Sequence, residues 1–77
     1  MHTTVINIDK EILGGTPVFN GTRVPIKNLF DYIETGETID EFLNDFDGVS
    51  KAQVIRVLEM SNKLIQSSTT ILNENIA

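Results

Sequence analysis

The sequence contains no cysteine and no tryptophan, and it has only one histidine. Without cysteine the chain forms no disulfide and offers no thiolate to a metal ion. No apolar run approaches the roughly 20 residues of a membrane helix. The first residues lack the basic and apolar regions of a signal peptide. We therefore expect a soluble, cytoplasmic protein with no cofactor and no metal site.

Residues suited to catalysis are equally scarce. His2 is the only histidine, so no Ser/His/Asp or Cys/His set can be assembled around a second one. The adjacent acids Asp40 and Glu41 suit the first turn of a helix, where the helix dipole favours negative charge. The Gly14-Gly15 pair lacks the spacing of a phosphate-binding loop. These observations predict a binding protein and not an enzyme.

The chain is short, with 77 residues. A domain of this size buries only about 60% of the surface that its unfolded chain exposes, so its stability as a monomer is marginal. Small domains often gain support from a disulfide, a metal ion or another chain. Because cysteine is absent, we expect a homo-oligomer such as a homodimer, or a complex with a partner.

Charge is distributed unevenly along the chain. Residues 31–47 include seven acids and no lysine or arginine, a net charge of −7, whereas the whole chain carries −5 and the remainder +2. The acids are Asp31, Glu34, Glu37, Asp40, Glu41, Asp45 and Asp47. Two interpretations remain open. The acids form the solvated faces of helices, or they form a surface that repels phosphates and suits a basic partner.

Short β-strands are expected near the N-terminus. Residues 5–8 contain the apolar residues of one strand. Asn20-Gly21 is the preferred centre of a two-residue type I′ turn, in which both residues take positive φ. Residues 18–19 are then expected to pair with residues 22–23. An isolated hairpin is barely stable in water, so this one must rest on the helical body or on another chain.

Three helices are expected after the hairpin. Pro25 suits the first helical position, and Gly36 suits the position that ends the helix. Between them, apolar residues recur with helical periodicity. They are Ile26, Leu29, Phe30 and Ile33.

The second and third helices each begin with a capping box, in which two side chains satisfy the first backbone N–H groups. Thr38 and Glu41 form the first box, and Ser50 and Gln53 form the second. The third helix continues through Leu64-Ile65, and its apolar pattern extends to Ile71-Leu72. Residues 67–70 are poor helix formers and predict fraying, and residues 73–77 are expected to form a loose tail.

A short turn containing Gly48 joins the second and third helices, as in a helix-turn-helix. In DNA-binding versions, residues near the start of the third helix contact base edges and phosphates. The predicted DNA-contacting residues are Ser50, Lys51, Gln53 and Arg56. The same residues are also what an ordinary amphipathic helix exposes to solvent. So few cations predict tight DNA binding only for a dimer or larger assembly.

Residues 15–26 read Gly-Thr-Pro-Val-Phe-Asn-Gly-Thr-Arg-Val-Pro-Ile. This run resembles the signature of a bacterial and archaeal family known as domain of unknown function 433. Residues 36–46 and 49–58 are similar to two further sequence blocks of that family. The chain departs from the pattern at residues 45–47, where Asp-Phe-Asp replaces a usual proline. It also has bulkier residues in the third helix, namely Val57, Leu58 and Met60.

The resemblance implies a homeodomain-like helix-turn-helix and an antitoxin of the VapB type. Such an antitoxin neutralises a PIN-like ribonuclease toxin, and it binds operator DNA to repress its own operon. The predicted partner or dimer contacts lie in the hairpin, at Phe19, Asn20, Thr22 and Arg23. Two interpretations of Arg23 remain open. It holds the hairpin by bonding helix carbonyls or an acid, or it contacts a phosphate or the carboxylates of a nuclease.

The expected fold is mainly α, a three-helix homeodomain-like helix-turn-helix preceded by an N-terminal β-hairpin. Its expected parts are a strand and hairpin arm (1–25), the helix-turn-helix domain (26–66), and a helix end with a flexible tail (67–77). The expected function is that of an antitoxin-like DNA-binding transcription regulator. The alternative is a protein–protein interaction module that does not bind DNA.

Overall fold

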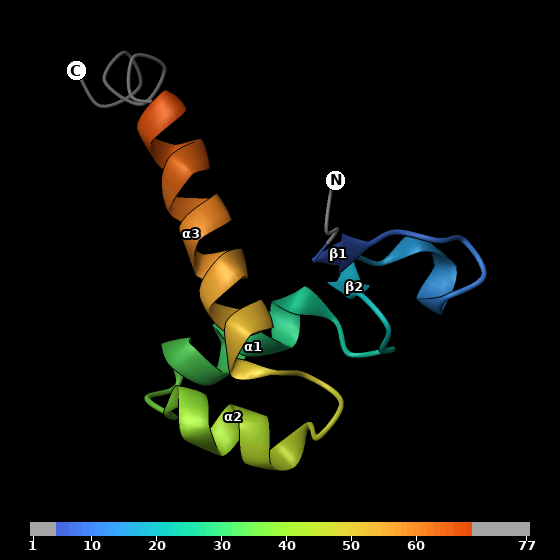
Figure 1. The fold of residues 1–77 in the computed structure, drawn as a ribbon, viewed down its shortest axis with the longest axis horizontal. Helices are drawn as coiled ribbons and strands as arrows, with labels where there is room; N and C mark the ends of the chain where they lie inside the picture. Colours follow the sequence, from blue (N-terminus) through green and yellow to red (C-terminus); the bar gives the residue numbers. More distant parts are fainter. Residues whose placement is uncertain (1–4, 69–77) are drawn as a thin grey trace.

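A computed structural model describes residues 5–68 of the chain as three helices and a two-stranded antiparallel sheet (Figure 1). In chain order the elements are β1 (Ile6–Asn7), a 3-10 helix η1 (Leu13–Gly15), β2 (Val18–Phe19), α1 (Ile26–Glu34), α2 (Ile39–Asp45) and α3 (Lys51–Ser67). The mainly α fold with an N-terminal pair of strands is therefore confirmed. The predictions for His2 and for residues 69–77, including the helix extension to Ile71-Leu72, lie outside the described residues.

The pairing of the strands differs from the prediction. β2 pairs with β1, with Ile6 opposite Phe19, and not with residues 22–23. On its other side the backbone N–H of Phe19 donates to the Val24 carbonyl at 3.0 Å, two residues later than expected. The reason is the turn, in which Gly21 has a φ of 81° but Asn20 has no positive φ. This matches a type II turn and not the predicted type I′ turn.

The core lies between the sheet and the three helices. Its buried residues are Val5, Phe19, Leu29, Phe42, Val49, Val54 and Val57. The rings of Phe19 and Phe42 lie 5.9 Å apart, and Tyr32 meets Phe42 edge-on at 5.4 Å. The prediction that Ile33 belongs to the apolar face of α1 is wrong, because α1 turns Tyr32 toward α2 and leaves Ile33 41% exposed.

The predicted helix ends are confirmed with one adjustment. Pro25 is the N-cap of α1 and not its first residue. At the other end Gly36 has a φ of 88° and donates its N–H to the Ile33 carbonyl, while the Glu37 N–H donates to the Tyr32 carbonyl. This pair of bonds is a Schellman motif. Both capping boxes form, at the start of α2 and of α3.

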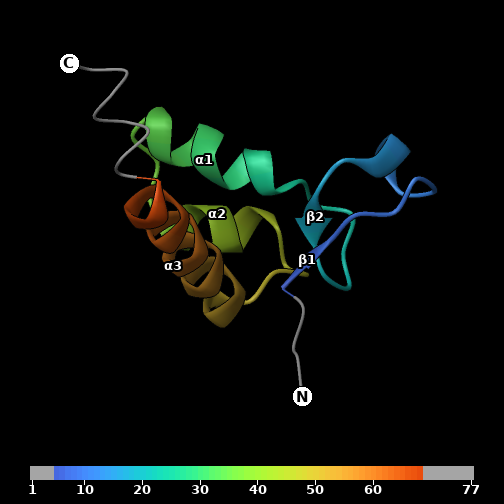
Figure 2. The same ribbon diagram turned by 90° about the horizontal axis from the view of Figure 1, so that it is seen from above.

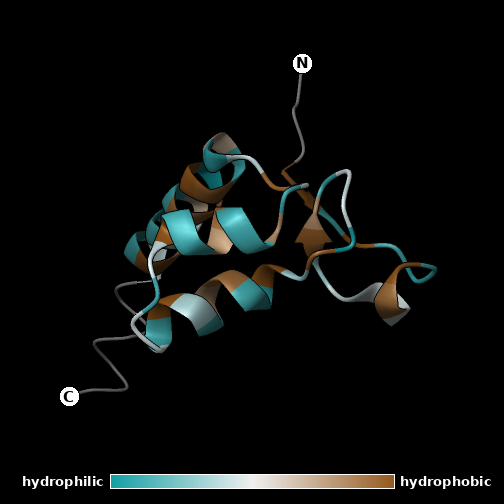
Figure 3. Ribbon diagram, turned by 90° about the horizontal axis from the view of Figure 1, so that it is seen from below, coloured by the Kyte–Doolittle hydropathy of each residue, from teal (hydrophilic) through white to brown (hydrophobic). Residues whose placement is uncertain are grey.

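α3 extends well beyond the other two helices (Figures 1 and 2). Of its residues only Val54 and Val57 are buried, and both lie in its first half. Its second half presents Met60, Leu64 and Ile65 to solvent. In Figure 3 apolar and polar segments alternate along α3, and β2 is uniformly apolar. No helix within residues 5–68 is long and apolar enough to cross a membrane.

Candidate functional site at the start of α3

The turn at Asn20-Gly21 and the start of α3 are joined by one side chain. Oε1 of Gln53 accepts the Ser50 backbone N–H at 3.0 Å and completes the capping box. Nε2 of the same amide donates to the Asn20 carbonyl, also at 3.0 Å. The Asn20 backbone N–H in turn donates to the Val5 carbonyl at 2.8 Å. Gln53 therefore connects α3 to the turn and, through the turn, to the N-terminal strand.

A second contact joins the turn to the loop between α2 and α3. The Thr22 hydroxyl donates to the Phe19 carbonyl at 2.8 Å and accepts the Val24 N–H at 3.0 Å, which fixes its side chain. Its methyl carbon lies only 3.4 Å from where a Cβ on Gly48 would stand. The hairpin turn and the loop before α3 thus meet closely. We call this meeting place, formed by residues 20–23 and 48–56, the turn–helix junction.

Three cations are exposed at the turn–helix junction, namely Arg23, Lys51 and Arg56. Within residues 5–68 none of them forms an ion pair. The proposal that Arg23 holds the hairpin by bonding an acid or a helix carbonyl therefore finds no such bond in the described part of the chain. Arg56 also lines an apolar hollow of about 260 Å³, together with Val5, Ala52 and Gln53.

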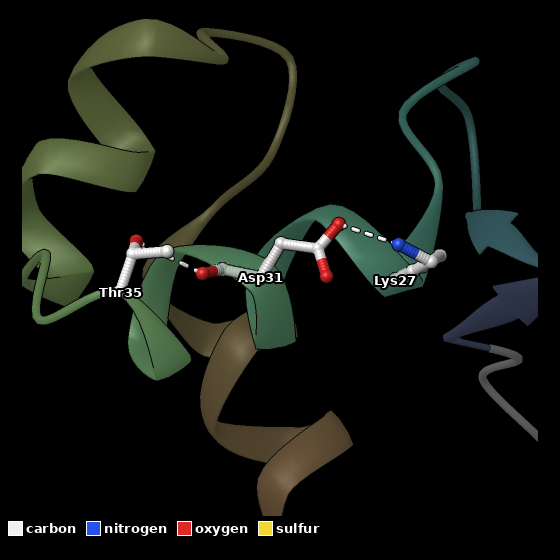
Figure 4. Close-up of polar contacts among 3 residues, drawn as sticks. All are labelled: Lys27, Asp31 and Thr35. Carbon is white, nitrogen blue, oxygen red and sulfur yellow. Dashed lines mark hydrogen bonds and ion pairs between the residues drawn. The ribbon is translucent and has the colours of Figure 1, made fainter.

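Lys27 differs from the cations of the junction because it forms an ion pair. Its ammonium lies 2.7 Å from a carboxylate oxygen of Asp31, and the Thr35 hydroxyl donates to the Asp31 carbonyl at 3.0 Å (Figure 4). The hydrogen bond and charge of Asp31 raise the pKa of Lys27. Lys27 is exposed, as the cations of the junction are, but its charge is matched on its own helix.

The predicted DNA-contacting residues are close together in the sequence, but they do not form one patch on the surface. Ser50 and Gln53 are engaged in the cap, so their hydrogen-bonding groups serve the fold. Lys51 and Arg56 are exposed, but five residues of helix separate them by about 140° around the axis. The same periodicity places Glu59 between them. The first turns of α3 therefore present two separate cations and not a continuous basic face.

The predicted partner contacts divide in the same way. The prediction that Phe19 is a surface contact is wrong, because Phe19 is 0% exposed and belongs to the core. Thr22 is half-buried and holds the turn. Asn20 and Arg23 are exposed. The structure thus brings the turn at Asn20 next to the start of α3, a proximity that no local sequence pattern indicates.

The acidic segment, residues 31–47, covers the end of α1, all of α2 and the connection between them. The Tyr32 hydroxyl donates to Asp45 at 2.6 Å, and this bond is the main reason that the pKa of Tyr32 is raised. The backbone N–H of Thr38 donates to Glu41 and is the main cause of a lowered pKa for that carboxyl. No group of three or more potential metal-ligating side chains occurs within residues 5–68. Asp45 therefore stabilises a contact between α1 and α2, and Glu41 stabilises the start of α2.

Two short helices and a longer third helix pack with a pair of strands, and the capped third helix is joined to the turn after β2. This arrangement defines a small mainly α protein. The profile of the family described as "Protein of unknown function (DUF433)" matches residues 6–59, more than half of the chain. The chain belongs to this family. No curated protein and no solved structure matches it.

Proposed function

We propose that the chain is an antitoxin-type transcription regulator that acts in the cytoplasm and binds DNA through the turn–helix junction. The observation that carries the proposal is the bond from Gln53 to the Asn20 carbonyl. It connects the turn that precedes Arg23 to the first turns of α3, which carry Lys51 and Arg56. All three side chains are exposed and unpaired within residues 5–68.

The chemistry of these residues suits phosphates better than base edges. Exposed cations that contact phosphates position a protein on the duplex and contribute affinity that depends on salt. The amide of Gln53, one of the predicted DNA-contacting residues, is already bonded at both ends. Base reading would fall to Arg56 or Lys51. The acids on α1 and α2 repel DNA and leave the junction as the side that faces it.

A gel shift with the DNA upstream of the chain's own gene tests this assignment. We expect the double variant Lys51→Ala/Arg56→Ala to bind more weakly than the unchanged chain. Lys27→Ala is the matched control, because Lys27 is exposed but paired with Asp31. Equal binding by the double variant and the unchanged chain would rule out the junction as the DNA surface.

The second part of the proposal is that the chain neutralises a PIN-like nuclease, as its resemblance to VapB-type antitoxins suggests. Arg23 is the exposed cation best placed on a turn to approach a cluster of carboxylates. The test is to express the neighbouring gene alone and together with this chain. We expect growth arrest in the first case, rescue in the second, and loss of rescue with Arg23→Ala. A neighbour that is harmless alone would contradict the antitoxin role.

A protein–protein interaction module without DNA binding is the second candidate. The observation in its favour is the apolar surface on the second half of α3, where Leu64 is 67% exposed. Protein surfaces of this kind often mark contact sites. Absence of any DNA affinity at low salt, together with a stable protein complex, would favour this candidate.

A further inference from the structure

α3 carries an apolar stripe that the rest of the described chain leaves open. Residues spaced three and four positions apart share one face of a helix. On α3 these are Val57, Met60, Ser61 and Leu64, which line a groove of about 310 Å³ together with Ile6 of β1 and Ile26 of α1. The groove therefore lies where α3 leaves the body of the molecule.

A side chain that could fill such a groove projects from the same helix. Leu64 lies at the groove's outer end and is 67% exposed, on the half of α3 that stands clear of α1 and α2 (Figure 1). Ser61 is small, and its hydroxyl already donates to the Val57 carbonyl at 2.9 Å. Burying Ser61 would therefore leave no donor unpaired. A chain that carries both a groove and a projecting apolar side chain is complementary to a second copy of itself.

We propose that a second copy of this chain covers the groove, with the two α3 helices antiparallel and crossing near Ser61. Leu64 of each copy then enters the groove of the other. The antiparallel arrangement follows from the position of the body, which packs against the first half of α3 at Val54 and Val57. A parallel pair would bring both bodies to the same end, whereas an antiparallel pair places them at opposite ends.

This dimer has a consequence for charge. Arg56 and Lys63 are seven residues apart, about two turns, and so lie on the same edge of α3 beside the stripe. Glu59 is three residues after Arg56 and four before Lys63, so it lies on the same edge between the two cations. A two-fold axis through an antiparallel pair places the same edge of both helices on one side. Each copy thus contributes two cations and one acid, a net charge of about +1, to one cationic edge that carries about +2 in the dimer and is incomplete in the monomer.

The cationic edge suits a polyanion, and its assignment to double-stranded DNA rests on the proposed function. Two copies bring more phosphate contacts to one duplex than one copy can. DNA affinity is then coupled to dimerisation, because a ligand that binds the dimer more tightly than the monomer also stabilises the dimer.

Sedimentation equilibrium of the full chain over a range of concentrations tests the dimer. The variant is Leu64→Glu, and the matched control is Ile8→Glu, since Ile8 is 66% exposed and does not line the groove. We expect dimers for the unchanged chain and the control, and monomers with an unchanged circular dichroism spectrum for Leu64→Glu. A monomeric unchanged chain, including one whose groove binds a different protein, overturns the proposal. So does a Leu64→Glu variant that still dimerises.

DNA titrations of the same proteins test the cationic edge separately. We expect Leu64→Glu to bind a labelled duplex more weakly and with about half the salt dependence, because only one copy's phosphate contacts remain. We expect Lys63→Ala to remain dimeric but to bind DNA more weakly. Unchanged DNA binding by monomeric Leu64→Glu would contradict the proposal that the cationic edge of the dimer binds DNA. If neither the unchanged chain nor any variant binds DNA, the DNA-binding role of the cationic edge and the proposed function are both wrong. The dimer is tested by sedimentation alone.

Discussion

The Gln53 amide donates to the Asn20 carbonyl across a separation of 33 residues, at 3.0 Å. The same side chain accepts the Ser50 N–H at the start of α3. One residue therefore caps the longest helix and attaches it to the turn after β2. The position of the turn before Arg23 relative to α3 therefore depends on the neutral side chain of Gln53.

Replacing Gln53 tests the importance of this connection. Gln53→Ala removes both bonds, and we expect the free energy of unfolding to fall by about 1–2 kcal/mol, the usual effect of losing a helix cap and a neighbouring hydrogen bond. Urea denaturation followed by circular dichroism measures the change. Gln53→Glu keeps an acceptor for Ser50 but has no donor for Asn20, so its stability should lie between the two. Unchanged stability of Gln53→Ala would show that the bonds of Gln53 to Ser50 and Asn20 do not stabilise the fold.

Replacing Phe19 tests its reassignment from the surface to the core. Phe19 is 0% exposed and packs on Phe42, and a buried Phe→Ala change commonly lowers stability by about 3–5 kcal/mol. That is comparable to the whole stability of a small domain, so we expect Phe19→Ala to be largely unfolded at room temperature. Ile33→Ala, at a position 41% exposed, should change the thermal midpoint little. A folded Phe19→Ala with an unchanged midpoint would contradict the core assignment.

The helices were predictable from sequence because their signals are local. Capping boxes at Thr38 and Ser50 and the terminating Gly36 each depend on residues within a few positions. The strand pairing was not predictable in the same way. Asn20-Gly21 does form a turn, but β2 finds its partner in β1, which lies outside the local window of the turn signal.

The candidate site was predictable only in its parts. The sequence places cations at Arg23, Lys51 and Arg56, but the connection of the turn before Arg23 to α3 depends on a hydrogen bond between residues far apart in the chain. Periodicity also could not show that Gln53 is occupied, because its second partner is a backbone carbonyl of the turn. Similarly, the face of α1 that packs is decided by the contact of Tyr32 with Phe42, which only the packed helices define.

The Tyr32–Asp45 hydrogen bond predicts a measurable titration. It raises the pKa of Tyr32 above its usual 10.0, with burial and the negative charge of Asp45 acting in the same direction. Because the folded chain favours the protonated phenol, this contribution to stability is complete below pH 10.0 and is lost as the pH rises through the folded-state pKa. Tyr32 is the only tyrosine and tryptophan is absent, so ultraviolet absorbance reports it alone.

Asp45→Asn provides the comparison for that titration. The amide is neutral and can accept only a weaker hydrogen bond from the phenol. We expect the pKa of Tyr32 to fall toward its value in the unfolded chain. An absorbance titration that is identical in the two proteins would show that the bond does not persist in solution.

DNA binding through the turn–helix junction is the central claim, and a salt series tests it most directly. The measurement is the affinity for a labelled duplex from upstream of the gene, for the unchanged chain, Arg23→Ala/Lys51→Ala/Arg56→Ala and Lys27→Ala. Each lost phosphate contact should reduce the slope of log affinity against log salt by about 0.9. We predict weaker binding and a shallower slope for the triple variant, and no change for Lys27→Ala. A triple variant with the affinity and salt slope of the unchanged chain would contradict the account.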